Sequence, residues 1–585
     1  MASAHALRIL HLCSILFLLS SLPAQAASPR LVIEGGGDRL QENIRSFIAL
    51  TDEPCNTPLW RLRARLRGLD KRVEKAGQAL GYYRMSWERQ LERDEDCWTL
   101  RLNLTPGEPV RLDQVNLSLA GEGAEDSAFQ KLLKTFDLRE GDPLNHGVYE
   151  SAKAQFAPLA SARGYFEGRF DQARIQVAQD RKTARLDLVY NTGPRYRFGE
   201  IHVNAEALDP EFIRRYLPFE TGDLYDMDLL LEFKNRLSSS DYFSRATVRP
   251  LLQALDQQRV PVSVETQARK RHSYSLGVGF ATDTGPRLLL GYENRYLNRR
   301  GHRFEANAQF AELGTQLEAA YKLPMHFPAH ESLRLSTGYQ TENTDDTRSD
   351  LITLGSDYAR SRPGSDWLQN YSLSYRREEF SVAGQAGRSS NLVLPAVSWS
   401  RTESDGGNYP RSGWGIFGRV SGTSSALGSD INFAQVYGRG KWIQSLGPVR
   451  ALLRLEAGAS QVGGFSRLPV SQRFFAGGDS SVRGYDFKAL GPTTLDPETG
   501  EQRVVGGNHL LVQSVELDAR IKGNWALAAF YDQGNAFDNN EFDLKRGAGL
   551  GLRWISPIGP IRIDIARALD EPRGFRLHLS MGPDL

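Results

Sequence analysis

This chain of 585 residues has few long apolar runs, few cysteines and almost no excess of either charge. Only residues 9–22 are strongly apolar, and no internal run approaches the roughly 20 residues that a membrane-spanning helix needs, which excludes a helical membrane protein. The 72 basic and 70 acidic residues nearly cancel, so the composition does not indicate nucleic-acid binding. Aromatic residues make up 10% of the chain, enough to build a core and to exclude a disordered protein.

The chain also lacks the motifs of common enzyme classes. It contains no Gly-x-Ser-x-Gly, no His-Glu-x-x-His, no Cys-x-x-Cys and no phosphate-binding glycine loop. The histidines, His326 and His330 among them, are scattered, and the pair Asp345-Asp346 lies in a polar stretch typical of a solvated loop. We therefore expect no enzymatic activity, no catalytic residue, no metal and no cofactor.

The apolar segment Ile9–Leu22 resembles a secretory signal peptide. It follows a single basic residue and precedes the small-residue sequence Ala24-Gln25-Ala26, so we expect residues 1–26 to be cleaved off near Ala26. An uncleaved membrane anchor is the alternative, although the run is short for one.

Two of the three cysteines, Cys55 and Cys97, follow this segment, whereas Cys13 lies within it. Neither has partners at the spacing of a metal site. Because an exported protein meets an oxidising periplasm, we expect a disulfide between Cys55 and Cys97.

Residues 31–267 repeat one pattern three times, at intervals of about 80 residues. Each copy has a strand-like opening, a helical stretch, an aromatic corner and two further strands. The corners are Gly81-Tyr82-Tyr83, Gly164-Tyr165-Phe166 and Asp241-Tyr242-Phe243. The pattern predicts a β-α-α-β-β unit with helices on one face of a small sheet. An open edge of that sheet can pair with an extended segment of another chain, or the repeats can serve only as spacers.

The chain from residue 269 onward alternates apolar and polar residues instead. In the first such segment Tyr274, Leu276, Val278 and Phe280 face one way, and the residues between them face the other. We expect about sixteen strands, with turn-rich stretches at 341–350 and 402–409. Alternating segments of about ten residues are typical of a transmembrane β-barrel, since a bilayer admits only helices and closed barrels. A secreted β-sandwich or propeller is the competing interpretation.

Several motifs in this half resemble those of the outer-membrane assembly-factor superfamily, the BamA/TamA-like proteins of Gram-negative bacteria. The sequence Val482-Arg483-Gly484-Tyr485 is similar to the lid-loop motif of that family. Phe530–Gly534 resembles its strand motif with a lumen-facing acid, and Ser556–Asp564 resembles its next-to-last hairpin. Tyr409–Gly413 and Gly506–Asn508 also fit, and the motifs occur in the family's order.

The resemblance implies POTRA repeats of the α+β class followed by a 16-stranded antiparallel transmembrane β-barrel. The domains we expect are a signal peptide at 1–26, POTRA domains at 27–106, 107–192 and 193–268, and the barrel at 269–585. Three repeats resemble the TamA type, the outer-membrane subunit of the translocation and assembly module. BamA-type chains carry five repeats, and two-partner secretion transporters carry two after a plug helix. The pair Cys55 and Cys97 is not expected of the family.

The resemblance also implies a location and partners. We expect a barrel in the outer membrane with its POTRA domains in the periplasm, where it assists the folding, insertion and secretion of autotransporters and other barrel clients. The partners would be these unfolded clients, outer-membrane lipid and an inner-membrane-anchored TamB-like protein. Two alternatives stay open: a two-partner secretion-type transporter that passes an unfolded protein through its pore, and a purely structural membrane anchor.

An arginine on a loop folded into a barrel needs a carboxylate partner. For Arg483 the first candidate is Asp532 and the second is Glu516, on the preceding strand; Gly534 belongs to the same lumenal motif as Asp532. Gly484 would allow a tight loop tip and Tyr485 would pack on the inner wall. The alternative is an ordinary surface loop.

Glycines mark both ends of the predicted barrel sheet. Gly277 and Gly279 lie in the first strand, expected at Ser273–Ala281, and Gly574 precedes the last strand. Because glycine weakens strands, we expect few hydrogen bonds at the seam between these strands, so that it opens sideways as a gate. The two exposed edges could then template a client strand.

Overall fold

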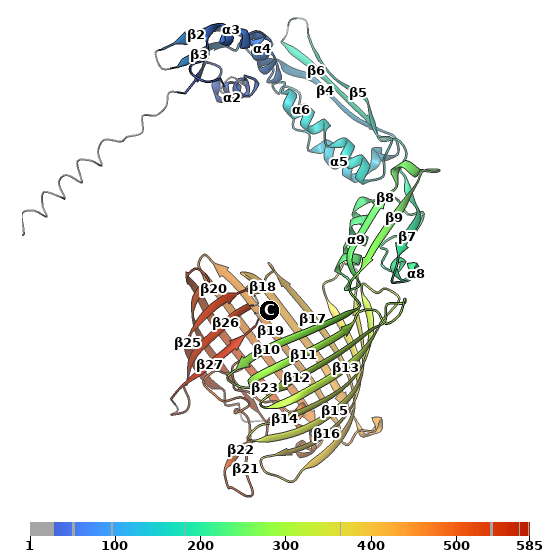
Figure 1. Ribbon diagram of the computed structural model, residues 1–585, viewed down its shortest axis with the longest axis vertical. Helices are drawn as coiled ribbons and strands as arrows, with labels where there is room; N and C mark the ends of the chain where they lie inside the picture. The colour runs from blue at the N-terminus through green and yellow to red at the C-terminus, as the bar shows by residue number, and fades with distance from the viewer. Residues whose placement is uncertain are drawn as a thin grey trace, which may run out of the picture. The chain divides into compact units, whose positions relative to one another are not determined.

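The computed structural model describes residues 28–48, 53–94, 97–178, 180, 182–362, 364–538, 542–557, 559–572, 574–582 and 584. The predicted signal peptide and its cleavage site lie outside these residues. The chain forms two compact units (Figure 1): one holds the first two repeats and part of the third, and the other holds the barrel and the rest of the third repeat.

The three repeats are built alike. Their elements are β1 (Arg30–Glu34), α2 (Gly37–Phe47), α3 (Leu59–Arg65), α4 (Leu69–Ala79), β2 (Ser86–Arg93) and β3 (Trp98–Thr105); β4 (Arg111–Ala120), α5 (Ser127–Lys134), α6 (His146–Lys153), α7 (Phe156–Ala162), β5 (Arg169–Val177) and β6 (Thr183–Asn191); β7 (Arg197–Ala205), α8 (Pro210–Arg214), α9 (Met227–Ser239), β8 (Phe243–Pro250) and β9 (Arg259–Ala268). The last strand of each repeat is central, in the orders β1-β3-β2, β4-β6-β5 and β7-β9-β8. Within the described ranges, no helix is long and apolar enough to cross a membrane.

The first two repeats differ from the predicted pattern, because each has three α-helices instead of two. Gly68, with a φ of +79°, adopts a left-handed conformation that separates α3 from α4. In the second repeat Pro158 lies in the first turn of α7 and supplies no N–H to the preceding turn, so α6 ends at Lys153 and a new helix begins at Phe156.

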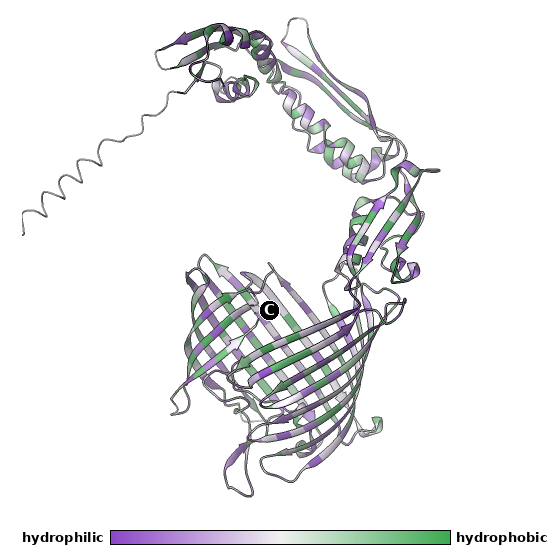
Figure 2. Ribbon diagram, viewed as in Figure 1, coloured by the Kyte–Doolittle hydropathy of each residue, from purple (hydrophilic) through white to green (hydrophobic). Residues whose placement is uncertain are grey.

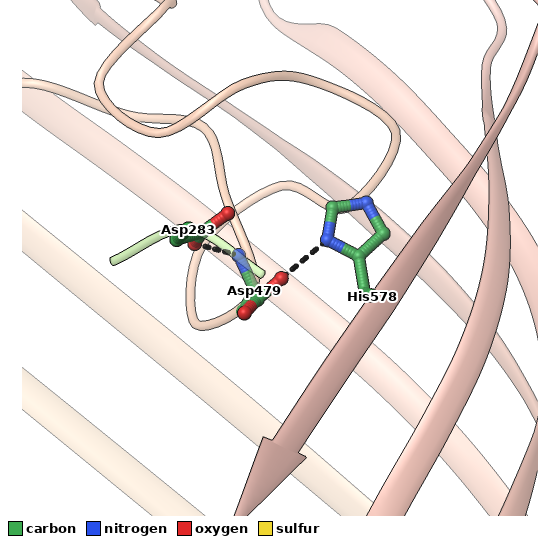
Figure 3. Close-up of side chains that lie close together, drawn as sticks. All are labelled: Asp283, Asp479 and His578. Atoms are coloured by element: carbon green, nitrogen blue, oxygen red, sulfur yellow. Dashed lines mark hydrogen bonds and ion pairs between the residues drawn. The ribbon is translucent and has the colours of Figure 1, made fainter. Parts of the chain in front are cut away.

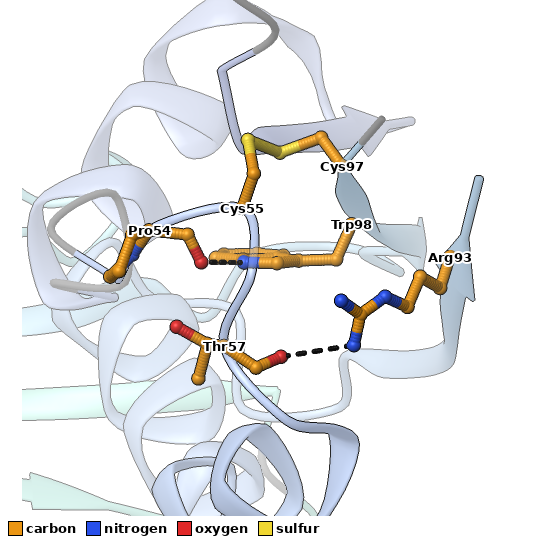
Figure 4. Close-up of a disulfide and its surroundings, with 6 residues drawn as sticks. All are labelled: Pro54, Cys55, Thr57, Arg93, Cys97 and Trp98. Atoms are coloured by element: carbon orange, nitrogen blue, oxygen red, sulfur yellow. Dashed lines mark hydrogen bonds between the residues drawn. A yellow bond between two sulfur atoms is a disulfide. The ribbon is translucent and has the colours of Figure 1, made fainter. Parts of the chain in front are cut away.

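The disulfide between Cys55 and Cys97 is present and joins the segment before α3 to the start of β3 (Figure 4). Hydrogen bonds reinforce the same connection. The indole Nε1–H of Trp98 donates to the carbonyl of Pro54 at 3.3 Å, and Arg93 donates to the carbonyl of Thr57 at 3.2 Å. Trp98 is almost fully buried, so the bridge lies directly over the core of the first repeat.

Replacing both cysteines by alanine is expected to destabilise the first repeat alone. The bridge spans 42 residues, and closing a loop of that length stabilises a fold by about 4 kcal/mol in the chain-entropy model. Hydrogen exchange of the whole chain, followed by mass spectrometry, should show faster exchange in β1 to β3. The second repeat serves as the internal control, and equal rates in the variant and the parent would contradict the prediction.

The junction of the second and third repeats depends on Asp126. Arg163 forms ion pairs with Asp126 at 3.1 Å and with Asp226 at 3.0 Å, and the hydroxyl of Tyr165 donates to Asp126 at 3.2 Å. Burial alone would raise the pKa of Asp126. The hydrogen bonds from the Ala128 N–H and Arg163 outweigh burial and hold this pKa below its ordinary value.

This junction is therefore expected to weaken in acid. A carboxylate whose folded-state pKa is lowered contributes stability above about pH 4, and that stability is lost as the pH falls through the folded-state pKa. Limited proteolysis between pH 3 and 5 should reveal faster cleavage near residues 163–226 at the acid end. Asp126→Asn should already be cleaved faster at pH 7 and should lose much of the pH dependence; an unchanged pH profile would refute this role of Asp126.

The second half of the chain forms a single sheet of sixteen strands, each antiparallel to the next along the chain. The strands are β10 (His272–Ala281), β11 (Gly285–Asn294), β12 (Arg303–Ala311), β13 (Gly314–Pro324), β14 (Glu331–Asn343), β15 (Thr347–Ser361), β16 (Leu368–Val382), β17 (Arg388–Ser404), β18 (Ser412–Thr423), β19 (Phe433–Leu446), β20 (Val449–Val462), β23 (His509–Lys522), β24 (Trp525–Phe537), β25 (Lys545–Ser556), β26 (Gly559–Ala568) and β27 (Phe575–Met581). The predicted barrel and its strand number are confirmed.

The outer face of the sheet is apolar. Tyr274, Leu276 and Val278 on β10 are each more than 70% exposed, as the alternation predicts, and Figure 2 shows apolar residues distributed along the strands. Such a surface is suited to lipid. The predicted turns are present at 344–346 and 405–411, but they are shorter or shifted relative to 341–350 and 402–409, since β14, β15 and β17 extend into these stretches. Their polar residues occupy strand ends, where a period-two apolar signal is lost.

The third repeat contacts the first turns of the barrel sheet. The hydroxyl of Tyr242, the aromatic residue of the third corner motif, donates to the carbonyl of Gly301. The guanidinium of Arg303 lies 4.0 Å from the Tyr242 ring and pairs with Asp241 at 3.0 Å. A side chain on Gly301 would meet the ring of Phe212 at 2.6 Å. These contacts join the part of the third repeat that belongs to the barrel unit to the start of β12.

Candidate functional site

The segment between β20 and β23, residues 463–508, is folded against the inner wall of the barrel; we call it the lid loop. It contains the short strands β21 (Thr493–Leu495) and β22 (Gln502–Val504). Many of its buried side chains form a cluster with residues of β23, β24 and β26: Phe474, Ala476, Val482, Tyr485, Leu490, Leu510, Val512, Ala536 and Ala568. The motif Val482–Tyr485 is therefore not on an ordinary surface loop.

Arg483 and Asp532 form the predicted ion pair, and the pair is bidentate. The guanidinium Nε donates to Oδ2 of Asp532 at 2.7 Å and Nη2 donates to Oδ1 at 2.9 Å. The backbone N–H of Arg483 donates to the same carboxylate at 3.1 Å. Three hydrogen bonds from one residue fix both the loop backbone and the side chain against β24.

A second layer of charge surrounds this pair. Nη1 of Arg483 donates to Glu516 at 2.8 Å and to Asp564 on β26 at 3.0 Å. Arg553 on β25 binds the other oxygens of the same two carboxylates. Two guanidinium groups thus lie among three carboxylates, and all five side chains are buried. The ring of Phe530 lies 3.4 Å from the guanidinium carbon of Arg483.

Sequence reasoning missed Asp564 and Arg553. Asp564 is the final residue of the hairpin motif Ser556–Asp564, so the motif marks this residue but does not show that it binds Arg483. Gly534, which belongs to the same predicted lumenal motif as Asp532, lies two residues farther along β24 and is buried on the same face of the strand. A side chain there would meet the carbonyl of Leu511 at 2.6 Å, which shows that Gly534 serves the close packing of β24 on β23.

Glycines create the space for the lid-loop tip. Gly484 has a φ of +101°, and a Cβ on it would lie 2.7 Å from the backbone N of Ala568. On the facing strand, a Cβ on Gly547 would lie 1.9 Å from the carbonyl oxygen of Arg483. Tyr485 is buried as expected, and its hydroxyl donates to the carbonyl of Arg546 at 3.3 Å. The loop tip therefore fits against β25 and β26 only because residues 484 and 547 are both glycine.

The strand order ends at β10 on one side and β27 on the other, and no ladder of paired residues joins them within the described part of the chain. Among the residues that the structure describes, two hydrogen bonds connect these ends. The Thr282 N–H donates to the carbonyl of Leu579 at 3.3 Å, and the Leu579 N–H donates to Oγ1 of Thr282 at 3.0 Å. By contrast, β27 is paired with β26 from Phe575 to Met581. We call the β10–β27 boundary the seam.

The predicted gate glycines lie beside this seam. Gly277 and Gly279 are in β10, where they pair with Leu289 and Arg287 of β11, and Gly574 immediately precedes β27. The geometry therefore places two of the glycines in the first seam strand and the third just before the last strand.

Three parts of the chain match known families. Residues 297–584 match the Omp85 superfamily domain, residues 30–106 match POTRA domain 1 of TamA, and residues 196–268 match a POTRA family described as a surface antigen variable number repeat.

Curated relatives extend the similarity over most of the chain. It is 25% identical over 531 residues to the outer membrane protein assembly factor BamA of Neorickettsia risticii, covering 86% of this chain and 69% of that protein. It is 22% identical over 567 residues to BamA of Neisseria meningitidis serogroup B, with coverage of 84% and 69%.

A solved structure shares the fold. The crystal structure of BamA from Haemophilus ducreyi lacking POTRA domains 1-3 superimposes with a TM-score of 0.67 at 15% identity, over 81% of this chain and 99% of that one. Family matches, relatives and fold agree: the chain belongs to the Omp85 superfamily of outer-membrane assembly and secretion proteins, with its barrel in the outer membrane and its POTRA domains in the periplasm.

Proposed function

We propose that this protein is a TamA-type assembly factor that folds and inserts barrel clients, autotransporters among them, at the β10–β27 seam. The observation that carries the proposal is the seam itself, where only Thr282 and Leu579 exchange hydrogen bonds among the described residues. A net hydrogen bond contributes about 1 kcal/mol, so separating these ends costs far less than opening a fully paired strand boundary. No ATP is needed, because folding of the client is itself downhill.

An opened seam offers what an unfolded barrel strand needs. Each exposed edge has unpaired N–H and C=O groups that template an incoming strand. The Arg483 network fixes the lid loop inside the barrel, which favours a route through the barrel wall over a route through the lumen. This is our reason to prefer an insertase to a two-partner secretion-type pore.

The POTRA domains supply a surface for partners. In each repeat the third strand is central, which leaves β1 and β2, β4 and β5, or β7 and β8 at the sheet edges. Because the first repeat matches the TamA type, we propose that an inner-membrane-anchored TamB-like protein docks on these domains within a translocation and assembly module. Sheet edges are suited to pairing with an extended segment of such a partner.

The test uses the full chain, after removal of its signal peptide, in liposomes. An unfolded autotransporter barrel is added, and its folding is followed by heat-modifiable migration and protease protection. Faster client folding, weakened in Arg483→Ala and unchanged in the matched surface variant Arg377→Ala, supports the proposal. No acceleration together with a large conductance would transfer the function to a secretion pore. If the protein neither accelerates client folding nor conducts ions, the remaining interpretation is a structural anchor.

A further inference from the structure

Three side chains from distant parts of the sequence meet beside the seam. Asp283 lies in the turn between β10 and β11, Asp479 lies in the lid loop and His578 lies on β27. Their ligand atoms are all within 4.8 Å of one another. Figure 3 shows Asp479 between the other two, with hydrogen bonds to each.

Asp479 contacts both ends of the barrel sheet. Its carboxylate accepts hydrogen bonds from the hydroxyl of Thr282, at 2.8 and 3.0 Å, and from Nδ1 of His578 at 2.5 Å. Its backbone N–H donates to Asp283. One lid-loop residue is therefore bound to the end of the first strand and to the last strand at the same time.

The bonds across the seam depend on this contact. The Thr282 hydroxyl donates its proton to Asp479, which leaves an oxygen lone pair free to accept the N–H of Leu579 at 3.0 Å. Without the carboxylate, the hydroxyl loses the acceptor that fixes its accepting orientation. The seam is held through a chain of bonds that runs from Leu579 through Thr282 to Asp479.

Both nitrogens of His578 are in use. The backbone N–H of Gly484 donates to Nε2 at 2.9 Å, and a backbone N–H can only donate, so Nε2 carries no proton. Nδ1 is then the protonated nitrogen that donates to Asp479. The spacing of the three residues would suit a metal ion, but with both imidazole nitrogens occupied in this way we interpret the group as hydrogen-bonded. Arg576 on β27 adds a second connection to the lid loop through Asp486.

We propose that Asp479 is a clasp through which the lid loop, instead of strand pairing, holds β10 to β27. Asp479, Thr282 and His578 are positioning residues, and the seam opens when the lid loop leaves this position. The proposal rests on the proposed function only in identifying the seam as the client gate; the clasp itself is a property of the protein without client.

The test is hydrogen exchange of the full chain in lipid nanodiscs, without client. Asp479→Ala should raise the exchange rate of peptides that contain Thr282 and Leu579 about tenfold or more, since that is the effect of losing one or two net hydrogen bonds. Peptides from β14 to β16 should be unchanged. Asp496→Ala is the matched control, because Asp496 lies in the same loop and accepts bonds from the nearby N–H groups of Glu498 and Thr499.

Smaller changes separate the two halves of the clasp. Thr282→Val removes the hydroxyl on the β10 side with little change in volume. His578→Asn retains a donor near the Nδ1 position and loses the acceptor for Gly484, whereas His578→Leu loses both. We expect exchange at the seam to be faster than in the parent in His578→Asn and faster still in His578→Leu.

Two results would overturn the clasp. The first is exchange at the parental rate in both Asp479→Ala and Thr282→Val, with heat-modifiable folding intact. The second is that a chelator raises the exchange rate at the seam of the parent protein as much as Asp479→Ala does. That result would mean that a metal ion bridges the three residues. If client folding fails in the earlier assay while the Asp479 variant still loosens the seam, the proposed function fails and the clasp stands.

Discussion

Replacing Arg483 by alanine is expected to release the lid loop and to lower client folding by at least about tenfold. The substitution leaves Asp532, Glu516 and Asp564 buried with Arg553 as the one remaining guanidinium of the described network. Removing one partner of a buried ion pair costs about 3–5 kcal/mol, mainly because the other charges stay buried without compensation. A pair exposed to water in the lumen would lose only about 1–2 kcal/mol, because solvent screens the charges. The burial of Asp532 moves the expectation to the higher value.

The measurement combines protease sensitivity of residues 463–508 with the liposome folding assay. Arg483→Lys is the informative second variant, since an ammonium retains the charge but not the fork that binds Asp532 with two nitrogens, so its effect should be intermediate. Arg377→Ala removes an exposed barrel arginine and should have no effect. A lid loop that stays protected in Arg483→Ala, with full client folding, would show that the buried network is dispensable.

Asp532→Leu combined with Arg483→Met separates charge from packing. Each single change leaves buried charge without its partner, whereas the double change removes both. The double variant should therefore recover part of the stability that either single variant loses. Client folding should not recover with it, because the loop is no longer fixed in one position.

Local patterns determine most of what the sequence predicts correctly. Period-two alternation marks the lipid-facing residues of β10, and the corner motifs mark the repeats. Pro158 and Gly68 show that the helix breaks were also readable, since proline and left-handed glycine interrupt helices wherever they occur. The pairing of Arg483 with Asp532 follows from two motifs that share one barrel.

What could not be predicted depends on the register and closure of the barrel. Asp564 and Arg553 lie on strands that reach the lid loop only once β24, β25 and β26 are side by side with a fixed stagger. The clasp joins residues 282, 479 and 578, and no periodicity links such distant positions. Gly534 lies on the same face of β24 as Asp532 and leaves room for the backbone of β23 at Leu511, a packing role that the motif alone does not reveal.

Joining β10 to β27 by a disulfide is expected to abolish client insertion while leaving the barrel folded. Cysteines at Thr282 and Leu579 suit this purpose, because the backbones of these residues already lie within hydrogen-bonding distance. If clients enter between the two strands, the oxidised protein should lose activity by about two orders of magnitude, and reduction should restore it. The chain should carry Cys55→Ala and Cys97→Ala, so that the reductant acts on the new bridge alone.

The control must be a bridge that rigidifies the barrel without touching the seam. Leu289 and Gln309 are register partners on β11 and β12, and a disulfide between them closes a strand boundary that is already fully paired. Activity in this variant, combined with its loss in the seam variant, would locate the route in the wall between β10 and β27. Full activity in the oxidised seam variant would contradict lateral opening. Clients would then have to pass through the lumen, where the Arg483 network holds the lid loop, and Arg483→Ala should in that case increase passage instead of reducing it.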